Sequence, residues 1–357
     1  MPEETINADT REVAVLPAYK KSALLVSTYI MICFVLRYIA VFVVNLVYNS
    51  LNGILMPDTV YILELCVSGL FLQILPCIIG AFMFHRLGKN GKGIRTLYTI
   101  PKSNTRAIGN LPAVYGLGQA VNIITIVITF LLTDYADLTR QLNTVSELSS
   151  TSPARAWFMF FMLVVIAPVF EEFMFRGLIM DELKPYGNGL AIFTTGILFG
   201  LFHGNLVQGL YTMAMGIALG YIANVTGSIF PTTIIHAILN SLGGIMILLM
   251  STHGVQMFYL NGMGGDIPDE DMIWLAIYGI FMISLFVFIA VGLVSAILKI
   301  KQIKRYKVPK VCPEISNGKK AAILILCVPS ILAIAMIIDT FCGFSRDFIA
   351  SLAGGGS

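Results

Sequence analysis

The amino-acid sequence predicts an all-α fold, a polytopic bundle of transmembrane helices in a cell membrane. Of the 357 residues, 57% are hydrophobic and only 12% are charged, and the mean hydropathy is +0.84. An average soluble domain carries about 25% charged residues, so lipid is the expected solvent for most of this chain. Long apolar runs in lipid indicate helices, because a helix satisfies its backbone hydrogen bonds within one segment.

Nine apolar segments have the composition of a transmembrane helix, which needs about 20 residues to cross the hydrocarbon core. They cover about 23–48, 59–84, 110–133, 156–181, 189–204, 208–225, 229–250, 272–298 and 320–343. The fifth and sixth segments are short and are joined by only a few residues. We therefore expect about nine spans.

The charge of the connecting loops predicts the orientation of these spans. Basic residues concentrate in 86–106 and 299–320, whereas the connections near 134–137 and 266–271 are acidic. Because short basic loops stay in the cytoplasm, nine alternating spans place the N-terminus inside and the C-terminus outside. This topology explains the basic residues without a nucleic-acid partner.

A single membrane domain is expected, and its segments differ in character. A polar N-terminal tail covers 1–22, and three helices with a basic cytoplasmic loop cover 23–149. The helical core over 150–250 carries the polar motifs described next, and the last two helices cover 251–353. Residues 354–357 resemble an artificial linker and are left out of the fold prediction.

The fourth predicted span carries three charged residues, although each charge inside a bilayer costs at least a few kcal/mol. Glu171 and Glu172 are adjacent, and Arg176 follows one turn later. The i,i+4 spacing pairs Glu172 with Arg176 on one helix face, whereas Glu171 points about 100° away. Apolar surroundings disfavour a charged carboxylate that has no partner, which suits general acid or base work by Glu171. A structural network of all three residues is the alternative.

Two of the four histidines lie in other predicted spans. Helical spacing places Phe199 over His203 in the fifth span and His236 over Asn240 in the seventh. A lone buried histidine is usually a packed core residue, but two of them near a paired-glutamate helix indicate a site. We expect Glu171, His203 and His236 to share a hydrated cavity that opens to the cytoplasmic side.

Three further charged residues lie in predicted spans, and we assign them structural roles. Arg37 and Glu64 lie near the outer side of the first two spans, where either an ion pair between them or snorkelling of each side chain to water is expected. Asp339 lies near the outer end of the last span and is expected to reach water.

The motifs on the fourth, fifth and seventh spans resemble those of the CPBP family, named for CAAX proteases and bacteriocin-processing enzymes and also called Abi. The family pattern runs EExxxR, FxxxH and HxxxN on successive core helices, and this sequence matches its order and spacing. The matching residues are Glu171, Glu172, Arg176, Phe199, His203, His236 and Asn240. The resemblance implies a helical membrane bundle with a water-accessible cavity, and the compact chain is more similar to the prokaryotic branch.

The resemblance further implies an intramembrane endopeptidase with Glu171 as the catalytic glutamate, His203 as its partner, and His236 with Asn240 completing the site. Our hypothesis is hydrolysis without a covalent intermediate, in which Glu171, helped by His203, takes a proton from a water molecule. Asn240 and His236 then donate hydrogen bonds to the developing oxyanion. The Glu172–Arg176 ion pair fixes the rotation of the fourth span and adjusts the proton affinity of Glu171.

A zinc-dependent version stays open, since Glu171, His203 and His236 can hold the metal and leave a position for water. We favour the metal-free version, because the sequence has neither an HExxH motif nor an evident fourth ligand.

The expected substrate is a peptide or protein. The candidates are a prenylated tail, a pheromone or bacteriocin leader peptide, a membrane protein segment and a leftover signal peptide. Two other classes remain: a non-catalytic membrane scaffold that binds a partner, and a proton-coupled transporter with helices broken near Pro168 and Gly204. Serine and aspartyl proteases are disfavoured, because no GxSxG motif is present and Asp339 is the one aspartate in a predicted span.

Overall fold

The computed structural model describes residues 8–88, 107–132, 152–260, 267–303 and 315–342, and the regular elements in these ranges are helices. The prediction of an all-α protein is confirmed. The α-helices are α1 (Ala8–Leu51), α2 (Pro57–Gly69), α3 (Leu75–Leu87), α6 (Leu111–Leu132), α9 (Pro153–Phe161), α10 (Ala167–Glu172), α11 (Asp181–Leu183), α12 (Asn188–Phe202), α13 (Leu206–Thr226), α14 (Phe230–Met250), α15 (His253–Leu260), α16 (Met272–Ile303), α17 (Asn317–Leu326) and α18 (Val328–Cys342). The π-helical segments are η1 (Leu70–Ile74), η2 (Met162–Ile166) and η3 (Phe173–Met180), and the 3-10 turns are η4 (Lys184–Tyr186) and η5 (Asp269–Asp271).

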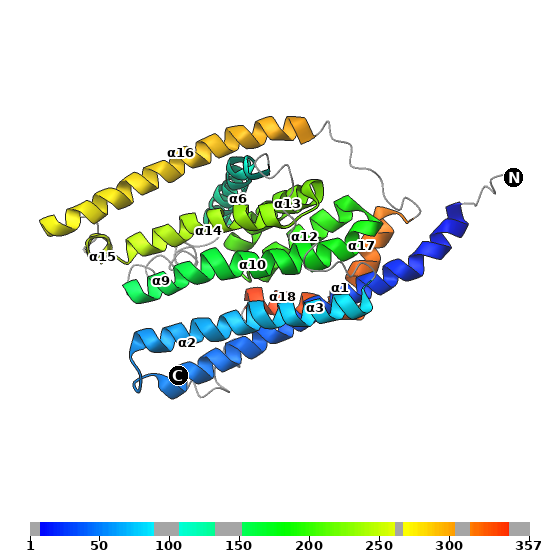
Figure 1. Ribbon diagram of the computed structural model, residues 1–357, viewed down its shortest axis with the longest axis horizontal. Coiled ribbons are helices and arrows are strands. Elements are labelled where there is room, and N and C mark those ends of the chain that lie inside the picture. The colour runs from blue at the N-terminus through cyan, green and yellow to red at the C-terminus, as the bar shows by residue number, and fades with distance from the viewer. Residues whose placement is uncertain (1–7, 89–106, 133–151, 261–266, 304–314, 343–357) are drawn as a thin grey trace.

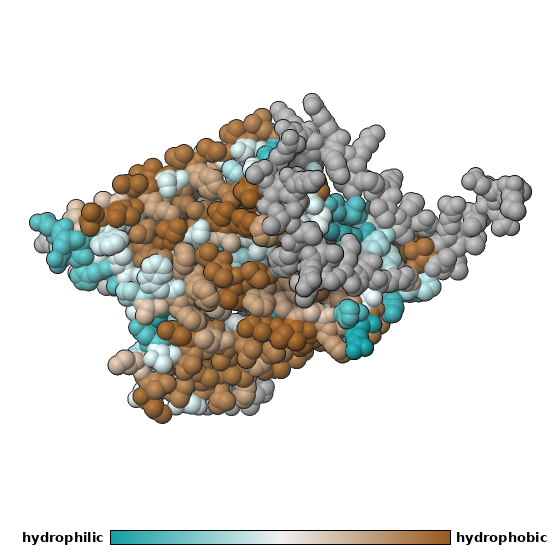
Figure 2. All heavy atoms as spheres, viewed as in Figure 1, coloured by the Kyte–Doolittle hydropathy of each residue, from teal (hydrophilic) through white to brown (hydrophobic). Residues whose placement is uncertain are grey.

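The long helices run side by side along the long axis of the molecule (Figure 1). Helix α16 lies at one edge and α1, α2 and α3 at the other, with α9, α10, α12, α13 and α14 between them. Helix α12 packs along α13, α6 packs against both α13 and α16, and α18 packs against α1. Figure 2 shows hydrophobic residues over most of the visible face, as expected for a protein surrounded by lipid.

Six helical stretches in the described ranges are long and apolar enough to cross a membrane, which confirms a multi-pass integral membrane protein. They are Val15–Leu51, Pro57–Leu87, Leu111–Ile128, Pro153–Tyr186, Phe230–Met250 and Asp269–Lys299. The bent pair α17–α18 makes a seventh if it is counted as one span.

The nine-span count is therefore reduced to six or seven in the part of the chain that the structure describes. Helices occupy all nine predicted segments. However, α12 has only 15 residues, which is too short for a full crossing, and α13 is not among the candidate spans. The orientation stays a prediction, because most of the basic connection over 89–106 and the acidic residues near 134–137 lie outside the described ranges.

The predicted last span is broken into two helices. Helices α17 and α18 meet at an angle of 72°, and Cys327 between them has an extended backbone. Pro329, the second residue of α18, has no N–H to donate to the carbonyl of Ile325 four residues earlier. The proline therefore accounts for the loss of helical continuity at this point.

Arg37 and Asp339 each bind a polar group of another helix. Arg37 donates from Nη1 to the Phe202 carbonyl at the end of α12, over 2.8 Å, and does not pair with Glu64. Asp339 accepts a hydrogen bond of 2.5 Å from the Tyr38 hydroxyl. The structural role expected for Arg37 is thus to satisfy a carbonyl at a helix end.

Glycines allow the closest contact between α6 and α16. A Cβ atom built on Gly116 would lie 2.1 Å from the carbonyl carbon of Gly292, so no side chain fits there. Such small-residue contacts hold membrane helices together, because lipid supplies no hydrophobic force between them.

Gly116→Ala is expected to destabilise the protein by about 1–3 kcal/mol, because the added methyl group forces α6 away from α16. Thermal unfolding of the purified protein in detergent measures the change. Gly279→Ala, on the same α16, is the matched control, since no described atom lies within 4 Å of its added Cβ. Equal stability of the two variants would contradict the assigned contact.

Candidate active site

The site is organised by an ion pair buried in the fourth predicted span. Arg176 Nη1 donates to Glu172 Oε1 over 2.7 Å, and both side chains have 0% exposure. The i,i+4 pairing predicted from the sequence is confirmed. Removing two charges from water is costly, so this pair needs further partners to be stable.

Arg176 obtains those partners from two other helices. Its Nη2 donates to the Gly216 carbonyl of α13 over 3.0 Å, and its guanidinium carbon lies 4.6 Å from the centre of the Phe199 ring in α12. A guanidinium over an aromatic face gains a favourable cation–π interaction when it is desolvated. The ion pair thus fixes α12 and α13 relative to the helix that carries it.

His236 of α14 lies between the two glutamates. Its Nδ1 is 3.1 Å from Glu172 Oε1, and its Nε2 is 3.8 Å from Glu171 Oε2. Glu172 already accepts from Arg176 and is therefore ionised, so the hydrogen atom of this contact belongs to His236 Nδ1. In the neutral ring, this arrangement leaves the lone pair on Nε2, which faces Glu171.

The two adjacent glutamates occupy different environments, as predicted. The Glu172 side chain is fully buried, whereas that of Glu171 is 13% exposed. Within the described residues, Glu171 forms no hydrogen bond and has His236 as its ion-pair contact. Its oxygens are therefore available to an added molecule such as water.

His203 closes the C-terminal end of α12. Its Nδ1 lies 2.8 Å from the Phe199 carbonyl and 3.3 Å from the Thr212 hydroxyl oxygen. The carbonyl can only accept, and Thr212 already donates to the Gln208 carbonyl over 2.7 Å. His203 Nδ1 therefore carries the hydrogen, and the neutral ring has its lone pair on Nε2.

Phe199 connects the polar residues of the cluster. Its ring centre lies 5.0 Å from that of His203 and 5.6 Å from that of His236, both in edge-on contacts. The structure brings Glu171, Glu172, Arg176, Phe199 and His236 together, with His203 in edge-on contact with Phe199. The residue in contact with Glu171 is His236, and no direct contact joins Glu171 to His203 among the described residues.

Asn240 of α14 donates a hydrogen bond to a backbone carbonyl of η2, a contact that was not predicted from the sequence. In η2, the N–H of Ala167 donates to the Met162 carbonyl five residues earlier. The next bond of this type would come from residue 168, a proline without an N–H, so the Leu163 carbonyl lacks a donor on its own helix. Asn240 Nδ2 donates to this carbonyl over 2.9 Å.

The zinc-dependent alternative requires Glu171, His203 and His236 to meet at one point. No group of three His, Cys, Asp or Glu side chains in the described part of the chain is arranged to hold a metal ion. Glu171 and His236 are neighbours, with 3.8 Å between Glu171 Oε2 and His236 Nε2.

Several contacts of the site were missed from the sequence. They are Thr212 beside His203, the Gly216 carbonyl, the Leu163 carbonyl, and Arg37 at the end of α12. One sequence signal was available, since Pro168 three residues before Glu171 must leave a carbonyl without its donor. The other contacts depend on how the helices pack.

The region that carries these site residues matches a known protein family. Residues 153–242 match the family described as type II CAAX prenyl endopeptidase Rce1-like, and the chain therefore contains a domain of this family of glutamate-type intramembrane proteases. The match covers the helices that carry all seven motif residues. No curated protein and no solved structure matched the chain.

The two glutamates are expected to differ sharply when each is made neutral. Glu172→Gln leaves Arg176 as an uncompensated buried charge and should cost about 3–5 kcal/mol of stability. Glu171→Gln, the matched neighbour, removes no such partner and should change stability by less than about 1 kcal/mol. Thermal unfolding in detergent compares them, and a larger loss in Glu171→Gln would contradict the described pairing.

Asn240→Ala is expected to destabilise the protein by about 1–3 kcal/mol, because the Leu163 carbonyl is left without a donor. Pro168→Ala restores a backbone N–H beside that carbonyl, so the cost should fall by about 1 kcal/mol in the double variant. A double-mutant cycle on unfolding temperatures measures this coupling, with Ser241→Ala as the control. Strictly additive effects would exclude the proline as the cause.

Proposed function

On the basis of this family membership, we propose that the chain cleaves peptide bonds within the membrane and that Glu171 activates the attacking water. The observation that carries this proposal is the contrast between two adjacent carboxylates. Glu172 is occupied by Arg176 and His236, whereas Glu171 is partly exposed and faces an imidazole nitrogen at 3.8 Å. A general base needs a free carboxylate oxygen within reach of its water, and Glu171 has one.

In the proposed reaction, a water molecule lies near Glu171 Oε2 and His236 Nε2. Glu171 takes one proton as the water oxygen attacks the substrate carbonyl carbon, which gives a tetrahedral intermediate. Glu171 then returns this proton to the leaving nitrogen, the carbon–nitrogen bond breaks, and the products are a carboxyl group and an amine. No covalent bond to the protein forms.

His236 is the residue that orients this water in our proposal. Glu172 fixes its ring by accepting from Nδ1, so the Nε2 lone pair is directed toward the water site. This assignment revises the expectation that His203 is the partner of Glu171. The arrangement resembles the general case in which a carboxylate holds a histidine in one tautomer for work at its other nitrogen.

His203 and Asn240 are assigned to the substrate side of the site. The fixed Nδ1–H of His203 leaves Nε2 for a hydrogen bond to substrate. Asn240 uses one amide hydrogen on the Leu163 carbonyl and has a second, which can reach a developing oxyanion. A substrate that binds here must enter among helices within the bilayer.

The substrate class that we propose is a peptide with a prenylated CAAX terminus, because the matching family is one of CAAX prenyl endopeptidases. A lipid-modified peptide partitions into the bilayer, where these helices lie. The other peptide substrates considered from the sequence, leader and signal peptides, are alternatives to be compared in the same assay.

Glu171→Gln is expected to lower the rate of peptide cleavage by about 10²–10⁴-fold, the usual contribution of a general base. The assay uses purified protein in vesicles and a farnesylated peptide with a fluorophore and quencher on either side of the scissile bond. Glu64→Gln, a glutamate in another span, is the matched control and should keep the wild-type rate. A chelator should leave the rate unchanged.

Two outcomes would contradict this assignment. Cleavage at the wild-type rate by Glu171→Gln would remove the proposed base. Absence of cleavage by the wild-type protein, together with an unchanged cellular phenotype in Glu171→Gln, would favour the non-catalytic scaffold. Activity that is lost with chelator and restored by zinc would contradict the metal-free reaction while leaving the endopeptidase assignment intact.

A further inference from the structure

Arg37 is a charged residue of the first candidate span, Val15–Leu51. Its Nη1 donates to the Phe202 carbonyl over 2.8 Å, and it forms no ion pair with a residue that the structure describes. Asp339 accepts a hydrogen bond from the neighbouring Tyr38 instead. A charged residue inside a bilayer is costly, and its usual role is to bind an ion, a substrate or a partner charge. The charge of Arg37 is therefore free to bind an anion.

Two other arginines of the described helices have an acidic partner. Arg176 Nη1 lies 2.7 Å from Glu172 Oε1, and Arg155 Nε lies 2.7 Å from Asp58 Oδ1. The single carbonyl that Arg37 binds does not require a charge, because a neutral amide could donate to it at a lower desolvation cost. The structural contact alone therefore does not account for an arginine at position 37.

The guanidinium of Arg37 has unused donors on one edge. An arginine carries five N–H groups in a planar fork, which matches the two oxygens of a carboxylate. Nη1 is taken up by the Phe202 carbonyl, whereas Nε and Nη2 have no hydrogen-bond partner among the described residues. Unlike Nε of Arg176, these two nitrogens are not sealed inside the protein. Arg37 can therefore offer two N–H groups side by side to an added carboxylate.

Arg37 borders the candidate active site at the end of α12. A Cβ atom built on Gly204 would lie 3.0 Å from Arg37 Cζ, so the guanidinium lies directly against the backbone that follows His203. Arg37 is also close enough to His203 to act on its ring electrostatically. Because His203 Nε2 is assigned to the substrate, an anion at Arg37 would lie on the substrate side of the site.

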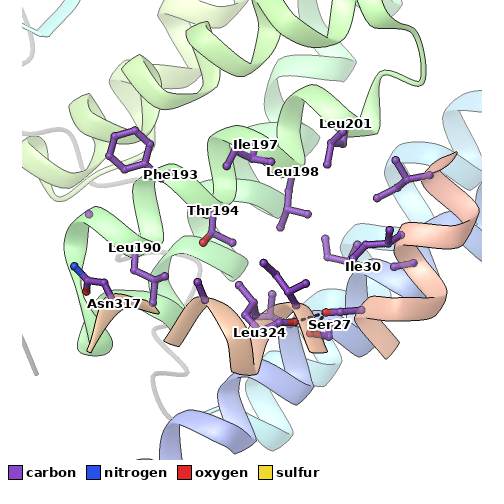
Figure 3. A pocket seen from close by; sticks show the side chains of 18 residues that line it. Ser27, Ile30, Leu190, Phe193, Thr194, Ile197, Leu198, Leu201, Asn317 and Leu324 are labelled. Carbon is purple, nitrogen blue, oxygen red and sulfur yellow. Dashed lines mark hydrogen bonds between the residues drawn. The ribbon is translucent and has the colours of Figure 1, made fainter. Parts of the chain in front are cut away.

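An apolar pocket of about 560 Å³ lies between α1, α12 and the bent pair α17–α18 (Figure 3). Ile30 and Leu201 line one end of this pocket. Arg37 follows Ile30 by seven residues, on the same face of α1, and binds the residue after Leu201. None of the described residues that line the pocket is charged, so the pocket supplies no counter-charge to Arg37. A substrate in the neighbouring site is therefore the favoured source of the anion.

We propose that Arg37 binds the C-terminal carboxylate of the peptide substrate, with Nε and Nη2 donating to its two oxygens. This inference rests on the proposed function, because a peptide with a CAAX terminus ends in a free carboxylate. The residues that follow the scissile bond then extend from Glu171 past His203 to Arg37. In this arrangement Arg37 distinguishes the end of a chain from an internal segment of a membrane protein.

Two farnesylated peptides of the same sequence test the proposal, one with a free C-terminal carboxylate and one with a C-terminal amide. Both are cleaved by the purified full chain in phosphatidylcholine vesicles, and kcat and KM are measured separately. The wild-type protein is expected to favour the free acid by about 10–100-fold in kcat/KM, the usual range for hydrogen bonds between charged groups. Most of this difference should appear in KM.

Substitution of Arg37 should remove this preference. Arg37→Gln is expected to bring the ratio of the two kcat/KM values close to one, because it slows only the free acid. Arg37→Lys keeps the charge but loses the planar fork, so it should keep part of the preference. Arg155→Gln is the matched control and should keep the wild-type ratio, because Arg155 already pairs with Asp58. A purely structural effect at the end of α12 would slow both peptides equally.

Binding to the Glu171→Gln variant separates this inference from the proposed function. A fluorescent free-acid peptide should bind this variant about 10–100-fold more tightly than the amide. The double variant with Arg37→Gln should bind both peptides equally. If the wild-type protein cleaves neither peptide while the binding preference is present, the proposed function fails and the assignment of Arg37 is retained.

Three results would overturn the assignment. One is an equal kcat/KM for the acid and the amide with the wild-type protein. Another is a ratio that stays at the wild-type value in Arg37→Gln, which includes an equal loss of both rates. The third is a preference that disappears when phosphatidylglycerol is added to the vesicles, because a lipid headgroup would then occupy Arg37. Arg37→Lys keeps the test decisive if Arg37→Gln fails to fold.

Discussion

The buried ion pair between Glu172 and Arg176 is the interaction on which the arrangement of the site depends. Arg176 binds a carbonyl of α13 and contacts an aromatic ring of α12, and Glu172 fixes the histidine of α14. Four helical segments are thereby held by two charges on one turn. Such a pair contributes little net stability after its desolvation cost, but breaking it is expensive. The main effect of the ion pair is to fix α12, α13 and α14 relative to the helix that carries it.

Because of this geometry, the adjacent residues Glu171 and Glu172 have different roles in our proposal. Glu172 is fully enclosed and committed to structural contacts, so it holds a fixed charge. Glu171 is rotated away from the pair and keeps access to an added molecule, beside a ring whose tautomer is already set. The position of a carboxylate on the helix circumference, rather than its residue type, decides which of the two does chemistry in our proposal.

Much of the fold and site followed from the sequence, because helical periodicity and apolar length are local properties. The all-α membrane fold was predicted from composition and apolar length, and the Glu172–Arg176 pair and the Phe199–His203 contact from helical spacing. The count of nine spans stays a prediction, with six or seven candidate spans in the described residues. Hydropathy does not distinguish a full crossing from α12, which is helical and apolar but only 15 residues long. The partner of Glu171 was missed for a different reason. Which histidine faces it depends on how α12 and α14 pack against α10 and η3, and no single segment encodes that.

The shortness of α12 has a consequence for where chemistry takes place in the bilayer. A helix of 15 residues rises roughly 22 Å, whereas the hydrocarbon layer is about 30 Å thick. Helix α12 starts just after the end of the preceding span, so its last carbonyls finish within the layer, where Arg37 supplies a donor to Phe202. The number of residues in α12 thus sets the depth of His203. Adding or removing one residue would shift that imidazole by about 1.5 Å along the membrane normal and turn it by about 100°.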